Sequence, residues 1–400
     1  MKRGSKMPLP DGARRQGKLV RACKRKVMPT YEKQIVGGNT VLKAPEASDR
    51  DLALDFAKGI LIILVIFGHL LQYIFYQGDG FWDSACFRWI YMFHMPLFMA
   101  ISGYLCRSAL LSKPFRQAIV DRVMQLLVPT LFWCTLLEAV KLIMLPRPPT
   151  APDNVLQFLH DFVGTYWFIW AAFASFLFVK LISIFNSWSS RALLVSVILV
   201  ALAPVTFSIF PLIKYTYPFF CVGFSFAQSR EWWTSIMRPH KPLLMMFTSI
   251  AAILCFIAWR EDTYVYNNLV LIQNLQSAKD ILLMFCGSAA ASAVMIEVLL
   301  QSWKIGRSSS AVRFIAAEVG QSTLLLYLVQ GTVFRLMDSI QYGEGWTPTM
   351  KSAAALILGT MIVAVALAVR WSMRDIPYLS QLILGAPPRL VRLPSNPANN

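Results

Sequence analysis

The stretch DFAKGILIILVIFGH, residues 55–69, decides the fold and carries the main candidate for chemistry. It lies inside an apolar run from about Leu52 to Tyr76, which is long enough to cross a bilayer as a helix. Three ionisable side chains interrupt this run, namely Asp55, Lys58 and His69. A spacing of 11 residues between Lys58 and His69 places both on one helix face, about 16 Å apart along the axis.

Ionisable groups inside a membrane helix are costly, so they normally face the interior of a bundle or a wet cavity. One interpretation makes the stretch an active-site helix in which His69 moves a proton. The other makes it a structural helix, in which Asp55 pairs with Lys58 near the interface and a neutral His69 is hydrogen-bonded in the core. The stretch alone leaves both interpretations open.

The composition is that of a membrane protein, because 56% of the 400 residues are hydrophobic and the apolar residues form many long blocks. We predict an all-α fold, a polytopic membrane helical bundle of about ten transmembrane helices. The sixth is interrupted by Pro218 and Gly223 and is expected to be tilted or broken. The expected spans lie near 52–76, 86–106, 118–144, 165–185, 192–210, 215–228, 242–259, 278–300, 314–337 and 352–372.

The formal charge of +17 is placed as membrane topology requires rather than as a nucleic-acid site. Residues 1–50 hold 13 Lys and Arg against 4 Asp and Glu, and we expect a disordered basic cytoplasmic tail. Such a tail either contacts anionic membrane lipids or, as is more usual, only determines the topology. With this tail inside, the inner loops and the C-terminal tail are rich in Lys and Arg and the outer loops are poor in them. The positive-inside rule then places both termini in the cytoplasm. The predicted membrane domain covers 51–373, followed by a cytoplasmic tail, 374–400.

The familiar cofactor and metal motifs are missing from the sequence. The seven cysteines form no CxxC pair, and no zinc site, P-loop or Rossmann fingerprint occurs. We therefore predict no metal. Internal repeats are typical of many secondary transporters, and this sequence has none.

Several segments in a fixed order resemble the acyltransferase-3 family of integral-membrane acyltransferases, most of all its fucose 4-O-acetylase-like and Nod-factor acetyltransferase branch. The resemblance covers about residues 50–372. It rests on DFAKGILIILVIFGH, RWIYMFHMPLFMAISGYLCR (88–107), the basic run ending in Leu-Leu-Val-Pro (116–129), YWFIWAAF (166–173), YPFFCVGF (217–224) and VGQSTLLLYLVQG (319–331).

The resemblance implies a bacterial inner-membrane, multi-pass O-acyltransferase. Such an enzyme moves acetyl from cytoplasmic acetyl-CoA to a sugar hydroxyl of an extracellular polysaccharide or its lipid-linked precursor. It makes His69 the catalytic candidate, and a neutral imidazole suits a general base. Asp55 lies about 20 Å from His69 along the axis, so we expect it to act by pairing with Lys58.

Three positions depart from the family pattern. Lys58 stands where the wider family often has Arg, Gln125 stands where many relatives have a second Arg, and Gln330 stands where relatives often have His. Lys and Arg are not equivalent at a bidentate phosphate site.

The remaining site residues each have a structural alternative. We expect Lys58, Arg122 and Arg116 to bind the CoA phosphates, although Arg122 also suits a positive-inside anchor. His94 and Ser102 are candidates for substrate binding, although His94 also suits a structural role in the helix and Ser102 close helix packing. Tyr166 and Trp167 are candidates for the acceptor cavity, although an interfacial aromatic belt would also place them there.

Two alternative functions remain at this point. A sugar-lipid transporter or flippase would use His69 in a proton relay, and a relative within the enzyme class would transfer succinyl or a longer acyl group. The sequence gives no prediction of the acceptor sugar or of the oligomeric state.

Overall fold

The computed structural model describes residues 33–36, 39–42, 51–76, 79–144, 151–185, 190–205, 207–263, 275–337 and 345–385. The chain divides into two compact units, Met1–Asp51 and Leu52–Asn400, which are described separately.

The first unit contains a short antiparallel strand pair. Strand β1 (Lys33–Val36) pairs with β2 (Asn39–Leu42), with Lys33 opposite Leu42 and Val36 opposite Asn39. Within the tail predicted to be disordered, residues 1–50, these two strands are the described part, and the disorder of the tail stays a prediction. The rest of that tail lies outside the described residues.

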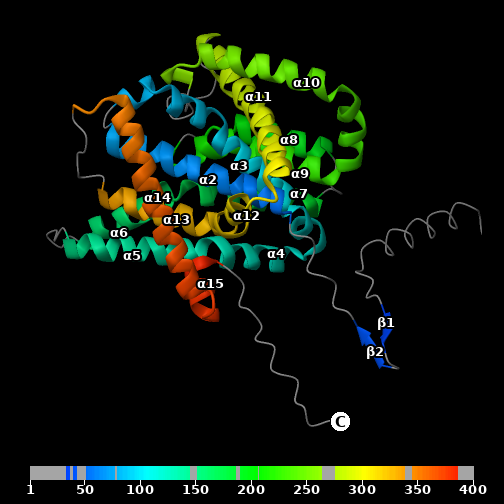
Figure 1. Cartoon of the computed structure of the whole chain (residues 1–400), viewed down its shortest axis with the longest axis horizontal. Coiled ribbons are helices and arrows are strands. Elements are labelled where there is room, and N and C mark those ends of the chain that lie inside the picture. Colours follow the sequence, from blue (N-terminus) through cyan, green and yellow to red (C-terminus); the bar gives the residue numbers. More distant parts are fainter. Residues whose placement is uncertain are drawn as a thin grey trace, which may run out of the picture. The chain divides into compact units, whose positions relative to one another are not determined.

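In its described part, the second unit is built from helices (Figure 1). In chain order the helices are α2 (Leu52–Leu70), α3 (Ala85–Ser112), α4 (Phe115–Arg122), α5 (Val128–Met144), α6 (Ala151–His160), α7 (Trp167–Phe185), α8 (Ser190–Leu202), α9 (Phe210–Gln228), α10 (Arg230–Ala258), α11 (Leu275–Gly306), α12 (Ser310–Phe314), α13 (Thr323–Met337), α14 (Pro348–Met373) and α15 (Pro377–Leu384). Short π-helical turns join or extend some of them: η1 (Leu71–Phe75), η3 (Val123–Leu127), η4 (Asp161–Thr165) and η6 (Ile315–Val319). The 3-10 turns are η2 (Asp79–Asp83), η5 (Glu261–Thr263) and η7 (Gly320–Ser322).

Local sequence explains several helix starts. The Ser84 hydroxyl accepts a hydrogen bond from the Phe87 N–H at 3.4 Å, which caps α3. The Thr347 hydroxyl accepts one from the Met350 N–H at 3.3 Å, and Pro348 occupies the first turn of α14.

The predicted all-α membrane bundle is confirmed for this unit, but the span count changes. Within the described residues, eight helices are long and apolar enough to cross a membrane. The fifth expected span is the shorter apolar helix α8, of 13 residues. The sixth, expected to be tilted or broken, is the continuous 19-residue helix α9, which runs through Pro218.

Helices α2 and α3 form the centre of the unit. Within their most apolar windows, 67% of the α2 span and 72% of the α3 span are buried, against 6% of the α10 span. Because α2 is central, its polar side chains are largely enclosed by protein, whereas α10 lies at the edge of the unit (Figure 1).

Two glycines let α3 and α9 touch along their backbones. A Cβ on Gly103 would lie 2.0 Å from the Phe220 carbonyl oxygen, and one on Gly223 would lie 1.8 Å from that of Ala100. No side chain fits at either point. The close packing expected of the Ser102–Gly103 segment is therefore observed.

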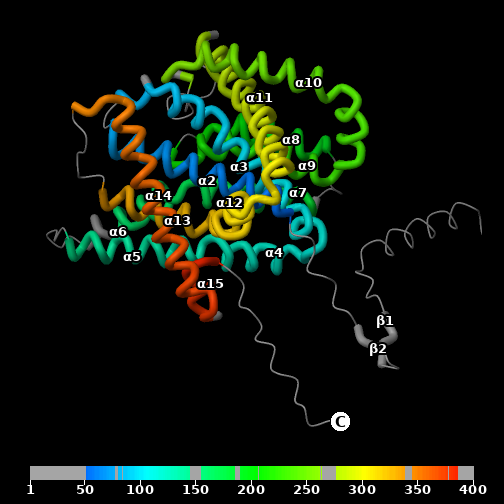
Figure 2. The backbone as a smooth tube through the Cα atoms, viewed as in Figure 1, coloured from blue at the N-terminus to red at the C-terminus, as the bar shows by residue number. Residues whose placement is uncertain are grey.

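Helices α4, η3 and α5 follow one another along nearly one line (Figure 2). Three π-helical turns lie beside polar side chains of the bundle. Turn η1 begins two residues after His69, η3 begins directly after Arg122, and η4 begins at Asp161. Such turns add a residue to a helix and change the direction of the side chains beside it.

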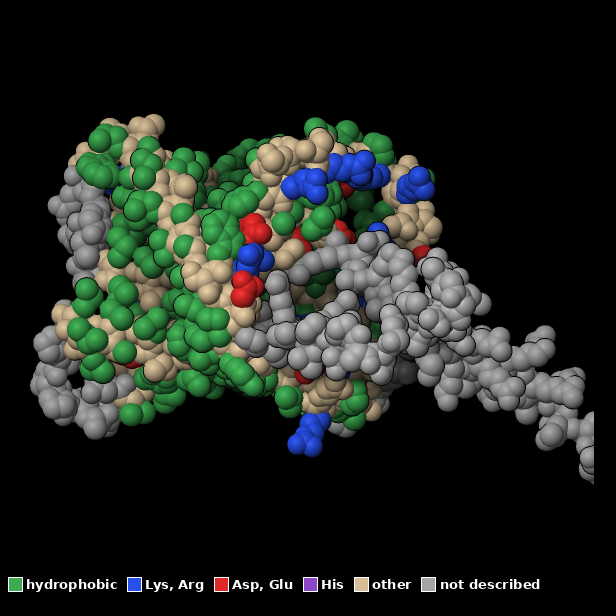
Figure 3. Space-filling model, turned by 60° about the horizontal axis from the view of Figure 1, so that its bottom comes forward, with side chains coloured by type: hydrophobic (Ala, Val, Ile, Leu, Met, Phe, Trp, Pro, Cys, Tyr) green, Lys and Arg blue, Asp and Glu red, His purple; other side chains and the backbone are tan. Residues whose placement is uncertain are grey.

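The surface suits a lipid environment. Hydrophobic side chains cover much of the face in Figure 3, and Lys and Arg side chains gather mainly in its middle and right. Large apolar residues are exposed on the peripheral helices, for example Leu199 on α8, Ile257 on α10 and Ile357 on α14.

Candidate active site

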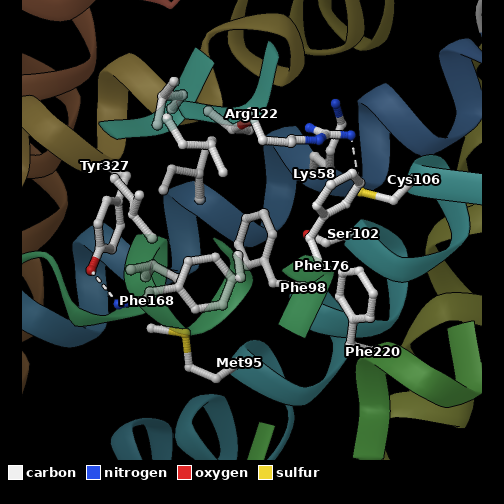
Figure 4. Close-up of a pocket in the computed structure, with 17 residues that line it drawn as sticks. Lys58, Met95, Phe98, Ser102, Cys106, Arg122, Phe168, Phe176, Phe220 and Tyr327 are labelled. Atoms are coloured by element: carbon white, nitrogen blue, oxygen red, sulfur yellow. Dashed lines mark hydrogen bonds between the residues drawn. The ribbon is translucent and has the colours of Figure 1, made fainter. Parts of the chain in front are cut away.

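Two cavities lie along α2. We name the first the cationic cavity, because Lys58 and Arg122 line it together with Ser102, Cys106 and Tyr327. Its volume is about 150 Å³, and most of its other walls are apolar or aromatic. In Figure 4, Lys58, Arg122 and Cys106 gather at one side of the cavity and Tyr327 lies at the other, with phenylalanine rings between them.

Lys58 is held by Asp55. Its Nζ lies 2.8 Å from Asp55 Oδ1, and both side chains are largely buried. The expected pairing of these two residues is therefore observed. It leaves Asp55 as a counter-charge to Lys58, at the opposite end of the helix from His69.

Arg122 is oriented by three contacts. Its Nη1 donates to Gln125 Oε1 at 2.6 Å, and its Nη2 donates to Cys106 Sγ at 3.0 Å. Its guanidinium carbon lies 4.9 Å from the centre of the Phe176 ring. Gln125, at the position where many relatives have a second arginine, thus positions Arg122. The third expected CoA ligand, Arg116, is exposed on α4 and does not line this cavity.

We name the second cavity the histidine chamber, because His69 lines it with Tyr73, Trp167, Tyr327 and Gln330. Its volume is about 760 Å³. Three aromatic rings lie close to the His69 ring: its centre lies 5.6 Å from that of Tyr73, 6.0 Å from that of Tyr91 and 5.7 Å from that of Phe334. The imidazole is therefore framed by rings and partly exposed to the chamber.

Tyr327 belongs to both cavities. Its hydroxyl accepts a hydrogen bond from the Phe168 N–H at 3.3 Å, and the two rings are 5.9 Å apart between centres. Helix α2 passes from Lys58 and Val65 in the first cavity to His69 in the second. The cationic cavity and the histidine chamber thus share one tyrosine in their walls.

The four predicted substrate-binding residues are divided. Ser102 lines the cationic cavity and Trp167 lines the histidine chamber. Tyr166 is buried, and its hydroxyl shares a 2.9 Å hydrogen bond with that of Thr332. His94 is also buried and lines neither of these two cavities.

The tautomer of His94 follows from its hydrogen bond. Its Nδ1 lies 2.8 Å from the carbonyl oxygen of Ile90, which can only accept. Nδ1 therefore carries the proton, and Nε2 of the neutral ring is an acceptor that has no partner among the described residues. Tyr91 contacts His94 at 4.5 Å between ring centres and also contacts His69.

An ionic network at the wall of the histidine chamber was not anticipated from the sequence. Asp161 is fully buried and pairs with Lys141 and with Arg335, whose Nη2 lies 3.1 Å from Asp161 Oδ1. Arg335 also donates from Nε to the Thr165 hydroxyl at 3.0 Å, and it lines the chamber. Burial raises the pKa of Asp161, but the Lys141 hydrogen bond and the Arg335 charge outweigh it and lower that pKa to about 2.

Weak signals for this network were present. Arg335 is a charge within an apolar stretch and Asp161 immediately precedes one, and such residues are rarely lipid-facing. In the sequence, Gln330 is distinguished only as a departure from the family pattern, whereas in the structure it lines the chamber. Within the described residues, no group of three His, Cys, Asp or Glu side chains has the arrangement of a metal site.

Comparison with known proteins agrees with this architecture. A family model described as an acyltransferase domain matches residues 51–371. The chain is 52% identical over 343 residues to nodulation protein NolL of Mesorhizobium japonicum, covering 86% of this chain and 92% of that protein. It is 52% identical over 347 residues to nodulation protein NolL of Sinorhizobium fredii, covering 86% of this chain and 95% of that protein. No solved structure matches.

These matches confirm the resemblance and favour an enzyme over a sugar-lipid transporter. Because the family model covers most of the chain and both relatives are 52% identical to it, the chain belongs to the acyltransferase-3 family of integral-membrane acyltransferases, and it is an O-acyltransferase.

Proposed function

We propose that this membrane enzyme is an O-acetyltransferase, which moves acetyl from acetyl-CoA to a hydroxyl of a carbohydrate. The acceptor is an extracellular polysaccharide or its lipid-linked precursor. The observation that carries the proposal is the pair of cavities on α2, one with two cations and one with a histidine, which share Tyr327.

The cationic cavity suits the donor. Lys58 and Arg122 would hold the CoA phosphates, since charge-assisted hydrogen bonds to phosphate are strong. A cavity of about 150 Å³ is well below the 300–1,000 Å³ that commonly hold drug-sized ligands, so the nucleotide would stay at the mouth and the pantetheine arm would enter. The axial distance of about 16 Å from Lys58 to His69 is comparable to an extended arm.

The histidine chamber suits the acceptor. At about 760 Å³ it has room for a sugar residue. Trp167 and Tyr73 line it and offer flat apolar faces, while Gln330 and Arg335 offer hydrogen-bonding groups. His94 and Tyr166 would act by supporting this chamber rather than by touching the sugar.

The chemistry then needs one proton carrier. His69 accepts the proton of the acceptor hydroxyl while the oxygen of that hydroxyl attacks the thioester carbonyl carbon. The tetrahedral intermediate collapses, the carbon–sulfur bond breaks, and the proton returns from His69 to the CoA sulfur. The new ester oxygen–carbon bond replaces the thioester, so atoms and charge balance. The aromatic rings around His69 keep water from the thioester.

Donor entry from the cytoplasm and a bacterial inner-membrane location are part of the same proposal. They are supported by the excess of Lys and Arg in residues 1–50 and in the loops assigned to the inside.

The test uses membranes with the wild type, His69→Ala or His240→Ala, since His240 is an exposed histidine on α10 and serves as the matched control. Each receives radiolabelled acetyl-CoA and a lipid-linked oligosaccharide extract from the same cells. We expect label transfer by the wild type and by His240→Ala, and at least a hundredfold less by His69→Ala at equal expression.

Transfer persisting in His69→Ala would remove His69 as the base. No transfer by the wild type, with an active acetylase as control, would contradict the acetyl-CoA proposal. Unlabelled succinyl-CoA added as a competitor tests the longer-acyl alternative, because a succinyl enzyme would prefer it to acetyl-CoA.

A further inference from the structure

Gln330 carries a buried amide oxygen that has no hydrogen-bond partner in the part of the chain that the structure describes. The residue lies on α13 and is 1% exposed. Its Oε1 has no hydrogen-bond partner among the described residues, yet the side chain lines the histidine chamber. A buried oxygen without a partner is unfavourable, and most such atoms are paired in folded proteins.

The oxygen belongs to the same wall as the catalytic candidate. Tyr327, Gln330 and Phe334 are spaced three and four residues apart, so they share one face of α13. Phe334 packs edge-on against the His69 ring, with centres 5.7 Å apart. Gln330 therefore stands between the tyrosine shared by the two cavities and the ring that contacts His69.

The helix that carries Gln330 is firmly held at this point. A Cβ on Gly331 would lie 3.0 Å from the Tyr166 ring, so α13 approaches that ring closely. The Thr332 hydroxyl bonds to that of Tyr166, and Arg335 bonds to Thr165 and Asp161. The unpaired oxygen is thus on a rigid support and not on a loop that would relax to find a partner.

We propose that Gln330 determines which acceptor hydroxyl is acylated. This inference rests on the proposed function. Gln330 Oε1 accepts a hydrogen bond from a second hydroxyl of the acceptor sugar, next to the hydroxyl that His69 deprotonates. A neutral amide oxygen can accept a hydrogen bond from a hydroxyl, whereas an ionised carboxylate has no hydrogen to donate to it. A sugar ring carries hydroxyls on neighbouring carbons. With both hydroxyls held, one orientation of the ring faces His69.

The proposal separates acceptor binding from donor binding, because Gln330 lines the histidine chamber and not the cationic cavity. The test compares the wild type with Gln330→Met, which is similar in length but lacks the oxygen, and with Gln330→Glu, which keeps an oxygen at that point. Gln321→Met is the matched control, because Gln321 contacts Arg370 at the start of the same segment and lines neither cavity. The probes are radiolabelled acetyl-CoA and the lipid-linked oligosaccharide extract, each varied in turn.

We expect Gln330→Met to raise the half-saturating amount of acceptor roughly tenfold, with that of acetyl-CoA unchanged. The ester in the product should also spread to neighbouring hydroxyls, as read by NMR of the released oligosaccharide. Gln330→Glu should recover most of the acceptor dependence and the single ester position, and Gln321→Met should match the wild type.

Equal acceptor dependence and one ester position in Gln330→Met would overturn the inference while leaving the proposed function intact. A parallel rise for donor and acceptor would also overturn it, since that pattern indicates a general loss of structure. If Gln330→Met fails to accumulate, Gln330→Leu carries the same test. No transfer by the wild type would overturn the proposed function and this inference with it.

Discussion

At the residue scale, the site depends on charges that the protein has already partnered. Asp55 balances Lys58, and Gln125 and Cys106 fix the fork of Arg122. A cation that is already held by a partner loses less conformational freedom on binding a phosphate. Single substitutions of Lys58 and of Arg122 therefore test the proposed phosphate site.

Arg122→Lys should weaken donor binding even though the charge is kept. Lysine cannot reproduce the two directed contacts to Gln125 and Cys106, nor the planar contact with Phe176. We expect a roughly tenfold higher half-saturating acetyl-CoA concentration and an unchanged acceptor dependence. Lys58→Ala should behave likewise, and Arg238→Lys, at an exposed position on α10, is the control. An unchanged donor dependence in both variants would place CoA elsewhere.

Asp161→Asn should destabilise the protein by about 3 kcal/mol at neutral pH, because two cations lose a buried counter-charge. The pKa of Asp161, about 2, lies below the usual value. Its contribution is therefore complete above the usual aspartate pKa, near 4, and is lost as the pH falls through about 2. Thermal unfolding in detergent should show a constant gap between the proteins from pH 8 to 5, and a smaller gap below about pH 4. A gap that stayed constant to the lowest pH would refute this assignment.

At the element scale, α2 and the pair α3 and α9 hold the site together. The sequence predicts α2, its shared face and the close packing at Gly103, because these depend on local periodicity and residue size. It does not predict that α9 is continuous, because Pro218 and Gly223 suggest a break in the helix. In the structure α9 runs through Pro218, and Gly223 allows close contact with the backbone of Ala100.

Gly223→Ala tests that contact. The added Cβ would lie 1.8 Å from the Ala100 carbonyl oxygen, so α3 and α9 must separate. We expect most of the folded, detergent-soluble protein to be lost. Gly359→Ala is the matched control, because its Cβ would meet only the Leu70 and Ile66 side chains, at 3.4 and 3.5 Å. Size-exclusion profiles of the two variants check this, and equal recovery would show that the helices separate without cost.

At the scale of the whole molecule, the described spans and the exposed apolar side chains are those of a polytopic membrane protein, and the family match makes it an enzyme. The sequence predicts the helical membrane bundle well, because the length and hydropathy of its apolar blocks suffice, whereas the enzyme class is predicted only through the family resemblance. It does not predict the two cavities or the Asp161 network, because residues such as Asp161 and Arg335 are 174 positions apart and meet only in the tertiary structure.

The proposed topology can be checked on the intact chain. Tags at the two ends should be protected from protease in intact spheroplasts and cleaved after lysis, because the excess of Lys and Arg would hold both termini in the cytoplasm. A periplasmic tag of known orientation is the control. Cleavage of either tag before lysis would reverse the assignment of that end.

The single tyrosine between the two cavities has a kinetic consequence. Under the proposed function each substrate would have a compartment of its own, so neither would have to leave before the other enters, and the reaction would require both to be present at once. Initial rates measured at several fixed amounts of one substrate should then give double-reciprocal lines that intersect. Parallel lines would indicate a covalent acyl-enzyme intermediate between two half-reactions. They would contradict the prediction drawn from two cavities that share Tyr327.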